Sequence, residues 1–149
     1  MRFFIPLFLL MAAGIVQADA IIVEQAYARA SIPGQSNAAA FVVITNQQQH
    51  PVSLTALDSD AANQVELHTH QHSNGTMQMR KVENLQLEPG QTLDLKKEDM
   101  HLMLMGLETP LQQGKQISIT FCFDEDCMDV DFPVISIKTE TQGQHHHHH

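Results

Sequence analysis

The sequence predicts an all-β domain, a sandwich or barrel of short strands, on three observations. Apolar and polar residues alternate over short segments, and turn residues separate these segments at regular intervals. After residue 20, no segment keeps the long apolar repeat of a helix. Short, evenly spaced strands of this kind are typical of sandwiches and barrels. We therefore expect one compact domain with little or no helix.

Three strands are expected in the first part of the chain. They are IIVEQAYARA (21–30), AAAFVVIT (38–45) and VSLTALDS (52–59). The loop SIPGQSN, built on Pro33-Gly34, separates the first two, and the polar run 46–50 before Pro51 separates the next two. The second of these strands is apolar along its length, which indicates a buried strand.

A further loop at 58–63 leads to the remaining strands, which follow one another closely. They are VELHTHQH (65–72), TMQMRKVE (76–83), QTLDLKK (91–97), HLMLMGL (101–107), KQISITFCF (115–123) and CMDVDFPVISI (127–137). Turns are expected at 88–90, 97–99, 109–114 and 124–126, where Gly, Pro or acidic residues gather.

Residues 1–20 have the pattern of a signal peptide. Arg2 provides a positive start, an apolar run follows at 3–16, and residues 18–20 have the small-x-small form of a cleavage site. The run is shorter than the roughly 20 residues of a membrane span, so an uncleaved anchor is the less favoured interpretation. No later segment is apolar enough to enter a membrane. We expect an exported soluble protein, in the periplasm of a bacterium.

The rest of the chain is expected to divide into a β domain at 21–138 and a disordered histidine-rich tail at 139–149. Few apolar residues follow Ile137, so the tail has little to bury. Its five terminal histidines have two interpretations, a purification tag or a native metal-binding segment, and the sequence leaves both open.

Composition excludes several classes of function. The net charge is −9, and loss of residues 1–20 leaves it unchanged because Arg2 and Asp19 cancel. The chain has only 8 Lys and Arg residues, without a basic cluster, so nucleic acid and anionic membranes are poor partners. No GxSxG, HExxH or phosphate-binding loop is present, and we expect a protein that is not an enzyme.

The stretch HTHQHSNGTMQM concentrates metal-binding side chains on one hairpin. Asn74-Gly75 predicts a two-residue type I′ turn, which places His70 opposite Met79. Because strand side chains alternate between faces, one face collects three imidazoles and two thioethers. They belong to His68, His70, His72, Met77 and Met79. A purely structural hairpin would gain little from such a face.

The segment HLMLM continues this chemistry on another strand. His101, Met103 and Met105 point one way, and Leu102 and Leu104 point the other. The leucines are the expected core face, so the histidine and the methionines face outward or into a pocket. Methionine is also a common core filler, and this alternative is more serious for Met105 than for Met103.

Thioethers and imidazoles together favour copper. Thioether sulfur is soft and selects Cu(I) over zinc, magnesium or calcium, and imidazole also suits copper. A site without thiolates avoids the loss of its ligands to disulfides in an oxidising compartment. Neutral ligands leave the bound ion cationic and moderately held, as a carrier requires.

The spacing of four of these residues resembles that of a known family. His68, Met79, His101 and Met103 match the H-x10-M-x21-H-x-M pattern of the periplasmic copper chaperones called PCu(A)C. The likeness extends to "VEQAYARASIPGQSNAAAFVVITN", the "ELH…MQMRKVE" hairpin and "PGQTLDLKKEDMHLMLMGLETPL". It implies a single-domain, cupredoxin-like Greek-key β-sandwich or barrel that binds Cu(I) at an exposed site through these four side chains.

The resemblance also implies a role and partners. These are delivery of copper to the CuA centre of cytochrome c oxidase, in its subunit II, and cooperation with a Sco-type copper protein. We expect a monomer that transfers copper by ligand exchange. The ideal hairpin puts His70 opposite Met79, whereas the family pattern selects His68, its diagonal neighbour. His70, His72, Met77 and Met105 therefore remain possible auxiliary ligands.

Cys122 and Cys127 flank the last predicted turn. They can pair across the hairpin with Cα atoms about 4.5 Å apart, within disulfide range. In an exported protein a disulfide is the favoured interpretation, and a dithiol redox or Cu(I) site is the alternative. No histidine adjoins Cys127, which argues against a blue-copper centre.

Two rival functions remain at the level of the sequence. A scavenging or storage protein could hold several Cu(II) or Zn(II) ions on the histidine hairpin and tail. A copper oxidase or reductase is the other rival, and no motif supports it.

Overall fold

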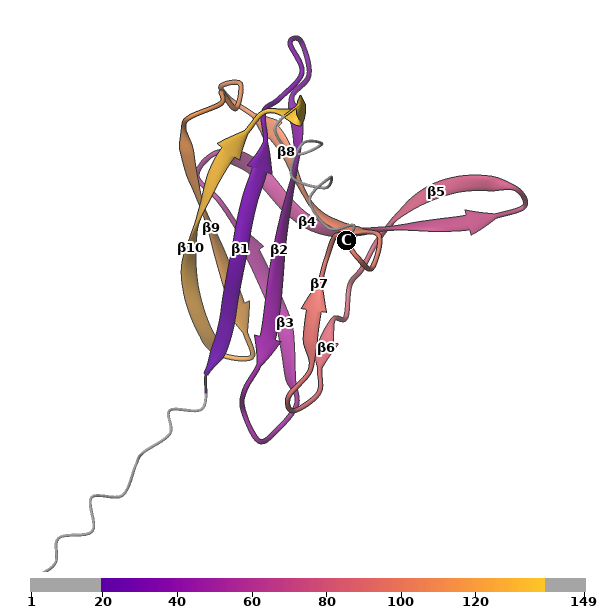
Figure 1. Ribbon diagram of the computed structural model, residues 1–149, viewed down its shortest axis with the longest axis vertical. Coiled ribbons are helices and arrows are strands. Elements are labelled where there is room, and N and C mark those ends of the chain that lie inside the picture. The colour runs from indigo at the N-terminus through magenta and orange to yellow at the C-terminus, as the bar shows by residue number, and fades with distance from the viewer. Residues whose placement is uncertain (1–19, 139–149) are drawn as a thin grey trace, which may run out of the picture.

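The computed structural model describes residues 20–138, which form an all-β domain (Figure 1). Its ten strands are β1 (Ile21–Arg29), β2 (Asn37–Asn46), β3 (Val52–Asp58), β4 (Ala62–Ser73), β5 (Thr76–Lys81), β6 (Gln86–Leu87), β7 (Thr92–Asp94), β8 (Met100–Leu107), β9 (Gln116–Phe123) and β10 (Asp126–Ile135). The predicted fold class is confirmed. Most of the expected signal peptide, residues 1–19, and the tail at 139–149 lie outside the described residues.

The strands form one continuous hydrogen-bonded sheet that folds into two layers. Its order is β5-β4-β8-β2-β1-β10-β9-β3-β6, with β7 paired to β2. β1 and β10 join the two layers through a parallel pairing, whereas the other pairings are antiparallel. The layer that contains β4, β5 and β8 carries the histidine and methionine side chains.

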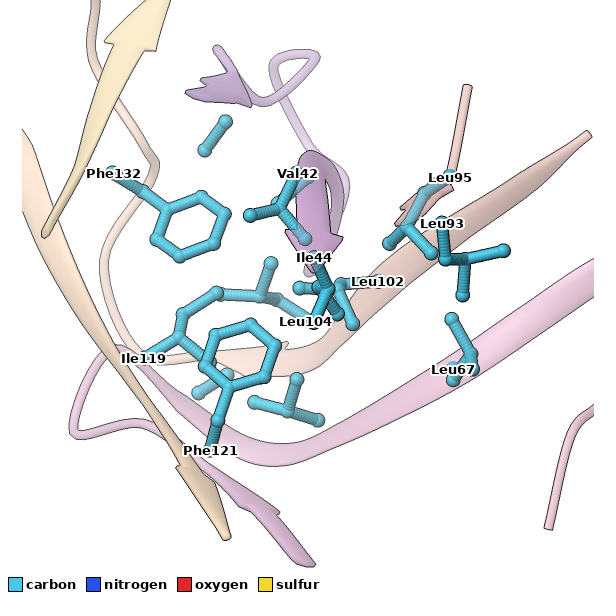
Figure 2. Packing of buried hydrophobic residues seen from close by; sticks show 14 of the residues in the cluster. Val42, Ile44, Leu67, Leu93, Leu95, Leu102, Leu104, Ile119, Phe121 and Phe132 are labelled. Atoms are coloured by element: carbon cyan, nitrogen blue, oxygen red, sulfur yellow. The ribbon is translucent and has the colours of Figure 1, made fainter. Parts of the chain in front are cut away.

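The core fills the space between the layers (Figure 2). Its fully buried large side chains include Ile44, Leu102, Leu104, Ile119, Phe121 and Phe132. Leu102 and Leu104 of β8 lie among them, which confirms that the leucines of HLMLM face the core. The other face of β8 is consequently free to present His101 and its methionine neighbours.

A β-bulge in β1 changes which side chains face outward. The register with β2 shifts between Glu24 and Tyr27, so two residues of different parity, Ile21 and Ala28, both reach the core. After the bulge, Tyr27 and Arg29 stand on the outer face, next to the strands that carry the histidines. Nothing in the alternation of the sequence predicts this switch.

The β4–β5 hairpin extends beyond the body of the domain (Figure 1). Asn74 and Gly75 have φ values of 52° and 77°, as the predicted type I′ turn requires. The pairing then runs without a shift from Ser73 opposite Thr76 to His68 opposite Lys81. The hairpin register expected from the sequence is therefore confirmed, and no bulge displaces it.

Two segments differ from the expected elements. β4 begins at Ala62, within the predicted 58–63 loop, because Ala62 pairs with Leu107 of β8 and is buried. Just after β5, the Val82 amide still donates to Leu67 of β4. The chain then crosses back to β3, where the Leu54 amide donates to Leu85. This return ends in the short strand β6, which the sequence did not indicate. Among residues 20–138, no helix is long and apolar enough to cross a membrane.

Candidate metal site

The candidate metal site lies on the outer face of three neighbouring strands, β5, β4 and β8. β4 is the central one: His70 pairs with Met79 of β5, and His68 pairs with His101 of β8. Leu67 and Leu102, the chain neighbours of His68 and His101, are buried in the core. Alternation therefore turns the imidazoles and the thioethers to the outside of the sheet.

His101 is the buried member of the group, with 4% of its surface exposed. Its ring lies 5.7 Å from the ring of His68, 5.2 Å from that of His70 and 6.4 Å from that of Phe41, between centroids. The pKa of His101 is lowered to about 4, mainly by burial and to a smaller extent by charge repulsion from His70, His68 and Arg29. His101 is thus neutral at pH 7, as a metal ligand must be.

His68 is held by a carboxylate on its own strand. Its Nε2 donates to Glu66 Oε2 at 2.8 Å, and the two side chains are only 14% and 15% exposed. Gln64 Nε2 donates to the other oxygen of Glu66 at 2.6 Å, and Lys81 Nζ lies 3.5 Å from the same oxygen. The hydrogen bond from His68 is the main cause that lowers the pKa of Glu66.

The other ring nitrogen of His68 has no partner. Nδ1 is buried and makes no hydrogen bond, which is rare for a buried polar atom. With the proton on Nε2, as the bond to Glu66 implies, Nδ1 carries a lone pair. Metal-binding histidines commonly have this arrangement, in which a carboxylate holds one nitrogen and the metal takes the other. The residues present therefore fit a metal ion.

The two methionines of the group border a hollow beside His101. The hollow has a volume of about 430 Å³ and is lined in part by His70, Met79, His101 and Met103. Met79 is 47% exposed, and Met103 is half-buried. The buried imidazole of His101 and the exposed thioether of Met79 both belong to this lining. His68 lies next to His101 but is not part of the lining.

Aromatic and basic side chains close one side of the hollow. Tyr27 and Phe41 stack with ring centroids 5.3 Å apart, and Arg29 lies over Phe41 at 4.6 Å. Lys96 Nζ donates to the Tyr27 hydroxyl at 3.2 Å and lies 5.8 Å from the Phe41 ring. These side chains offer no carboxylate to an ion, but Asp99 also lines the hollow, together with the imidazoles of His70 and His101 and the thioethers of Met79 and Met103.

The donor set discriminates between metals. Within residues 20–138, no three His, Cys, Asp or Glu side chains are grouped to hold an ion. Thioether sulfur is a soft donor that suits copper, and imidazole suits copper as well as zinc.

The remaining candidate ligands lie outside this group. His72 and Met77 pair with each other nearer the tip of the hairpin, and both are exposed. Met105 pairs with Gln64 of β4 and Asn37 of β2 and is half-buried, two residues beyond Met103. The structure thus brings together His68, His70, Met79, His101 and Met103.

Sequence reasoning missed the residues that support these side chains. Glu66 had a usable signal, because it lies two residues before His68 in an alternating strand and so shares its face. Arg29, Phe41 and Lys96 had none. The bulge in β1 turns Arg29 outward, the pairing of β2 with β8 brings Phe41 to the site, and the pairing of β7 with β2 does the same for Lys96.

The two cysteines serve a separate purpose. Cys122 and Cys127 form a disulfide across β9 and β10, with Cα atoms 4.0 Å apart. The favoured interpretation of the sequence is confirmed, and neither cysteine is free. Both lie in the opposite layer from β4 and β8, so the disulfide is not part of the candidate metal site.

Residues 21–134 match the lipoprotein family described as LpqE-like. The chain belongs to the LpqE-like family. A relative named as a lipoprotein, Lxx21020 from Leifsonia xyli subsp. xyli (strain CTCB07), is 33% identical over 110 residues. The match covers 73% of this chain and 65% of the relative, so this LpqE-like chain spans about two thirds of that protein's length.

Solved structures share the fold of this LpqE-like chain. The copper-bound PCuAC domain from PmoF2 has a TM-score of 0.66 at 18% identity, over 80% of this chain and 96% of that domain. CuI-DR1885 from Deinococcus radiodurans has a TM-score of 0.62 at 29% identity, over 83% of each chain. The structural likeness agrees with the PCu(A)C resemblance of the sequence.

Proposed function

We propose that this protein is an exported Cu(I)-binding metallochaperone, not an enzyme, whose ligands are His68, Met79, His101 and Met103. The observation that carries the proposal is the buried, unpartnered Nδ1 of His68 beside the buried, neutral His101. The copper bound in the PmoF2 and DR1885 structures supports the same conclusion.

The arrangement suits an ion that must be released again. His68 and His101 are set in place by Glu66 and by burial, so little reorganisation is needed when copper arrives. Met79, by contrast, is half-exposed on a projecting hairpin. An acceptor ligand can replace its thioether first and then withdraw the ion from the imidazoles of His68 and His101. Transfer is thus a sequence of ligand exchanges without a change in oxidation state.

We further propose the acceptor and the compartment. The PCu(A)C resemblance supports delivery to the CuA centre in subunit II of cytochrome c oxidase, in the periplasm, alongside a Sco-type protein. Membership of a lipoprotein family supports export to the cell envelope. The proposed carrier acts as a monomer.

The rival function, scavenging of several Cu(II) or Zn(II) ions, receives less support. It depends on clusters of histidine or acidic ligands, and residues 20–138 contain no such group of three. Its other element, the five terminal histidines, lies outside the described residues.

The decisive experiment is an anaerobic Cu(I) titration against a chromophoric chelator, with the double variant Met79→Leu/Met103→Leu. Leucine keeps the volume of methionine but removes the sulfur, so the fold is retained and the ligands are lost. We expect the Cu(I) affinity to fall about tenfold or more, equivalent to at least about 1.4 kcal/mol. The control is Met105→Leu, which removes a sulfur outside the group.

Unchanged Cu(I) affinity in the double variant would contradict the ligand assignment. Transfer of Cu(I) from the wild-type protein to an apo CuA domain tests the delivery step. Tight uptake of several Zn(II) or Cu(II) ions that is lost on removal of residues 145–149 would favour scavenging instead.

A further inference from the structure

We propose, resting on the Cu(I) function above, that the tip of the hairpin holds a second, weaker Cu(I) site formed by His72 and Met77. We call this the outer site, and we call the proposed site of His68, Met79, His101 and Met103 the inner site. Copper would pass between the two through His70. The outer site is the point at which copper enters from, or leaves for, another protein. His72 and Met77 are not ligands of the inner site. Substitutions can therefore remove the outer site and leave the inner one in place.

The hairpin arranges its donors as successive pairs on one face. The Val82 amide donates to Leu67, which marks His68 and Lys81 as a pair without mutual hydrogen bonds. Hydrogen-bonded and non-hydrogen-bonded pairs alternate along a regular antiparallel ribbon, so every second pair is of the same type. The pairs His70–Met79 and His72–Met77 are therefore also of this kind, and their Cα atoms are about 4.5 Å apart, with the side chains close together.

Exposure indicates that these methionines do not serve packing. Met77 is 57% exposed and Met79 47%, and they account for two of the four large hydrophobic side chains that are exposed within residues 20–138. A large apolar side chain contributes to stability by leaving water, and both residues leave water only in part on this ribbon. Met79 lies opposite His70, and Met77 lies opposite His72. A copper ion bound by each pair explains these positions instead.

The chemistry of the pair fits Cu(I) at reduced affinity. One thioether and one imidazole are soft, neutral donors, and Cu(I) accepts low coordination numbers. Two ligands on an exposed ribbon hold the ion less tightly than four donors around a buried imidazole. Successive pairs on one strand face are about 7 Å apart. His70 lies between the outer site and His101, with its ring 5.2 Å from that of His101. It can therefore exchange copper with the outer site and with the inner one.

The test uses the full mature chain labelled at its methionine methyl groups, titrated anaerobically with Cu(I) and followed by NMR. We expect the first equivalent to shift the methyl signals of Met79 and Met103. The second equivalent should shift the signal of Met77. In the variant His72→Gln/Met77→Leu the second equivalent should be lost, and the first should remain at its original affinity.

A matched control exists on the same ribbon. Gln71 and Gln78 pair with each other on the opposite face, so Gln71→Ala/Gln78→Ala changes the hairpin without touching the donors. Both equivalents should survive in this control. Transfer to an apo acceptor should be slowed in the His72/Met77 variant and unchanged in the control.

The two proposals fail in different ways. A Met77 methyl signal that stays unshifted through two equivalents, with wild-type transfer in the His72/Met77 variant, would overturn the outer site alone. Absence of a tight first equivalent at Met79 and Met103 would overturn the proposed function. Circular dichroism of each variant confirms that the β fold is retained.

Discussion

At the scale of single residues, the hydrogen bond between His68 and Glu66 decides which ring nitrogen of His68 keeps its lone pair. A histidine on an exposed strand is free to rotate and to exchange its proton between nitrogens. The carboxylate removes that freedom, and Gln64 and Lys81 in turn hold the carboxylate. The result is a buried nitrogen, Nδ1, that has a lone pair and no hydrogen-bond partner.

This positioning can be tested by removing the carboxylate. We expect Glu66→Ala to weaken Cu(I) binding by about 10–100-fold, because loss of a partner that orients a metal ligand has effects of this size. Gln64→Ala, one step further from the ring, should have a smaller effect. The measurement is Cu(I) affinity by chelator competition. Equal affinities for Glu66→Ala and the wild type would show that His68 does not bind through Nδ1.

At the scale of elements, the β4–β5 hairpin is the part of the fold that the sequence predicts best. Asn74-Gly75 specifies both the turn type and the register, since a two-residue loop leaves one way to pair the strands. The pairing of His70 with Met79 follows directly. The family pattern selects His68 instead, and the structure is compatible with either histidine. His68 is the diagonal neighbour of Met79 and pairs with His101 of β8.

The turn should control copper binding through the register. Gly75 has a φ of 77°, and an L side chain in this region costs about 1–2 kcal/mol. We expect Gly75→Ala to loosen the hairpin and to weaken Cu(I) binding while the body of the domain stays folded. Hydrogen exchange of the β4 and β5 amides measures the first effect, and chelator competition measures the second.

Gly114 provides the matched control for this change. Its φ is 86°, and it lies in the loop before β9, away from the site. Gly114→Ala should therefore carry a similar strain without a change in Cu(I) affinity. If both variants lost affinity equally, the effect would reflect general destabilisation rather than hairpin register.

At the scale of the whole molecule, the two layers have different tasks. One layer carries the candidate metal site, and the other supplies the aromatic core residues and the disulfide. Leu102 and Leu104 link the core to the candidate metal site. They pack into the core, and alternation along β8 then places His101 and Met103 on the outer face. The rigidity of the site thus comes from the core beneath it.

The disulfide should affect stability without affecting copper. It closes a loop with a sequence separation of 5, for which chain entropy predicts a contribution of about 2 kcal/mol. We expect Cys122→Ser/Cys127→Ser to lower the free energy of unfolding by this amount, measured by urea denaturation. Cu(I) stoichiometry and affinity should not change. A loss of copper in this variant would revive the interpretation of the cysteines as ligands.

The sequence by itself determined the class of fold, the hairpin register, the disulfide pair and the face on which each histidine and methionine lies. These features follow from the two-residue period of a strand and from tight turns, which act over a few residues. The tertiary structure alone decided that β8 lies beside β4, that Phe41 and Arg29 reach the site, and that His101 is buried and neutral. Strand order and burial depend on packing between segments far apart in the chain, and no local pattern encodes that packing.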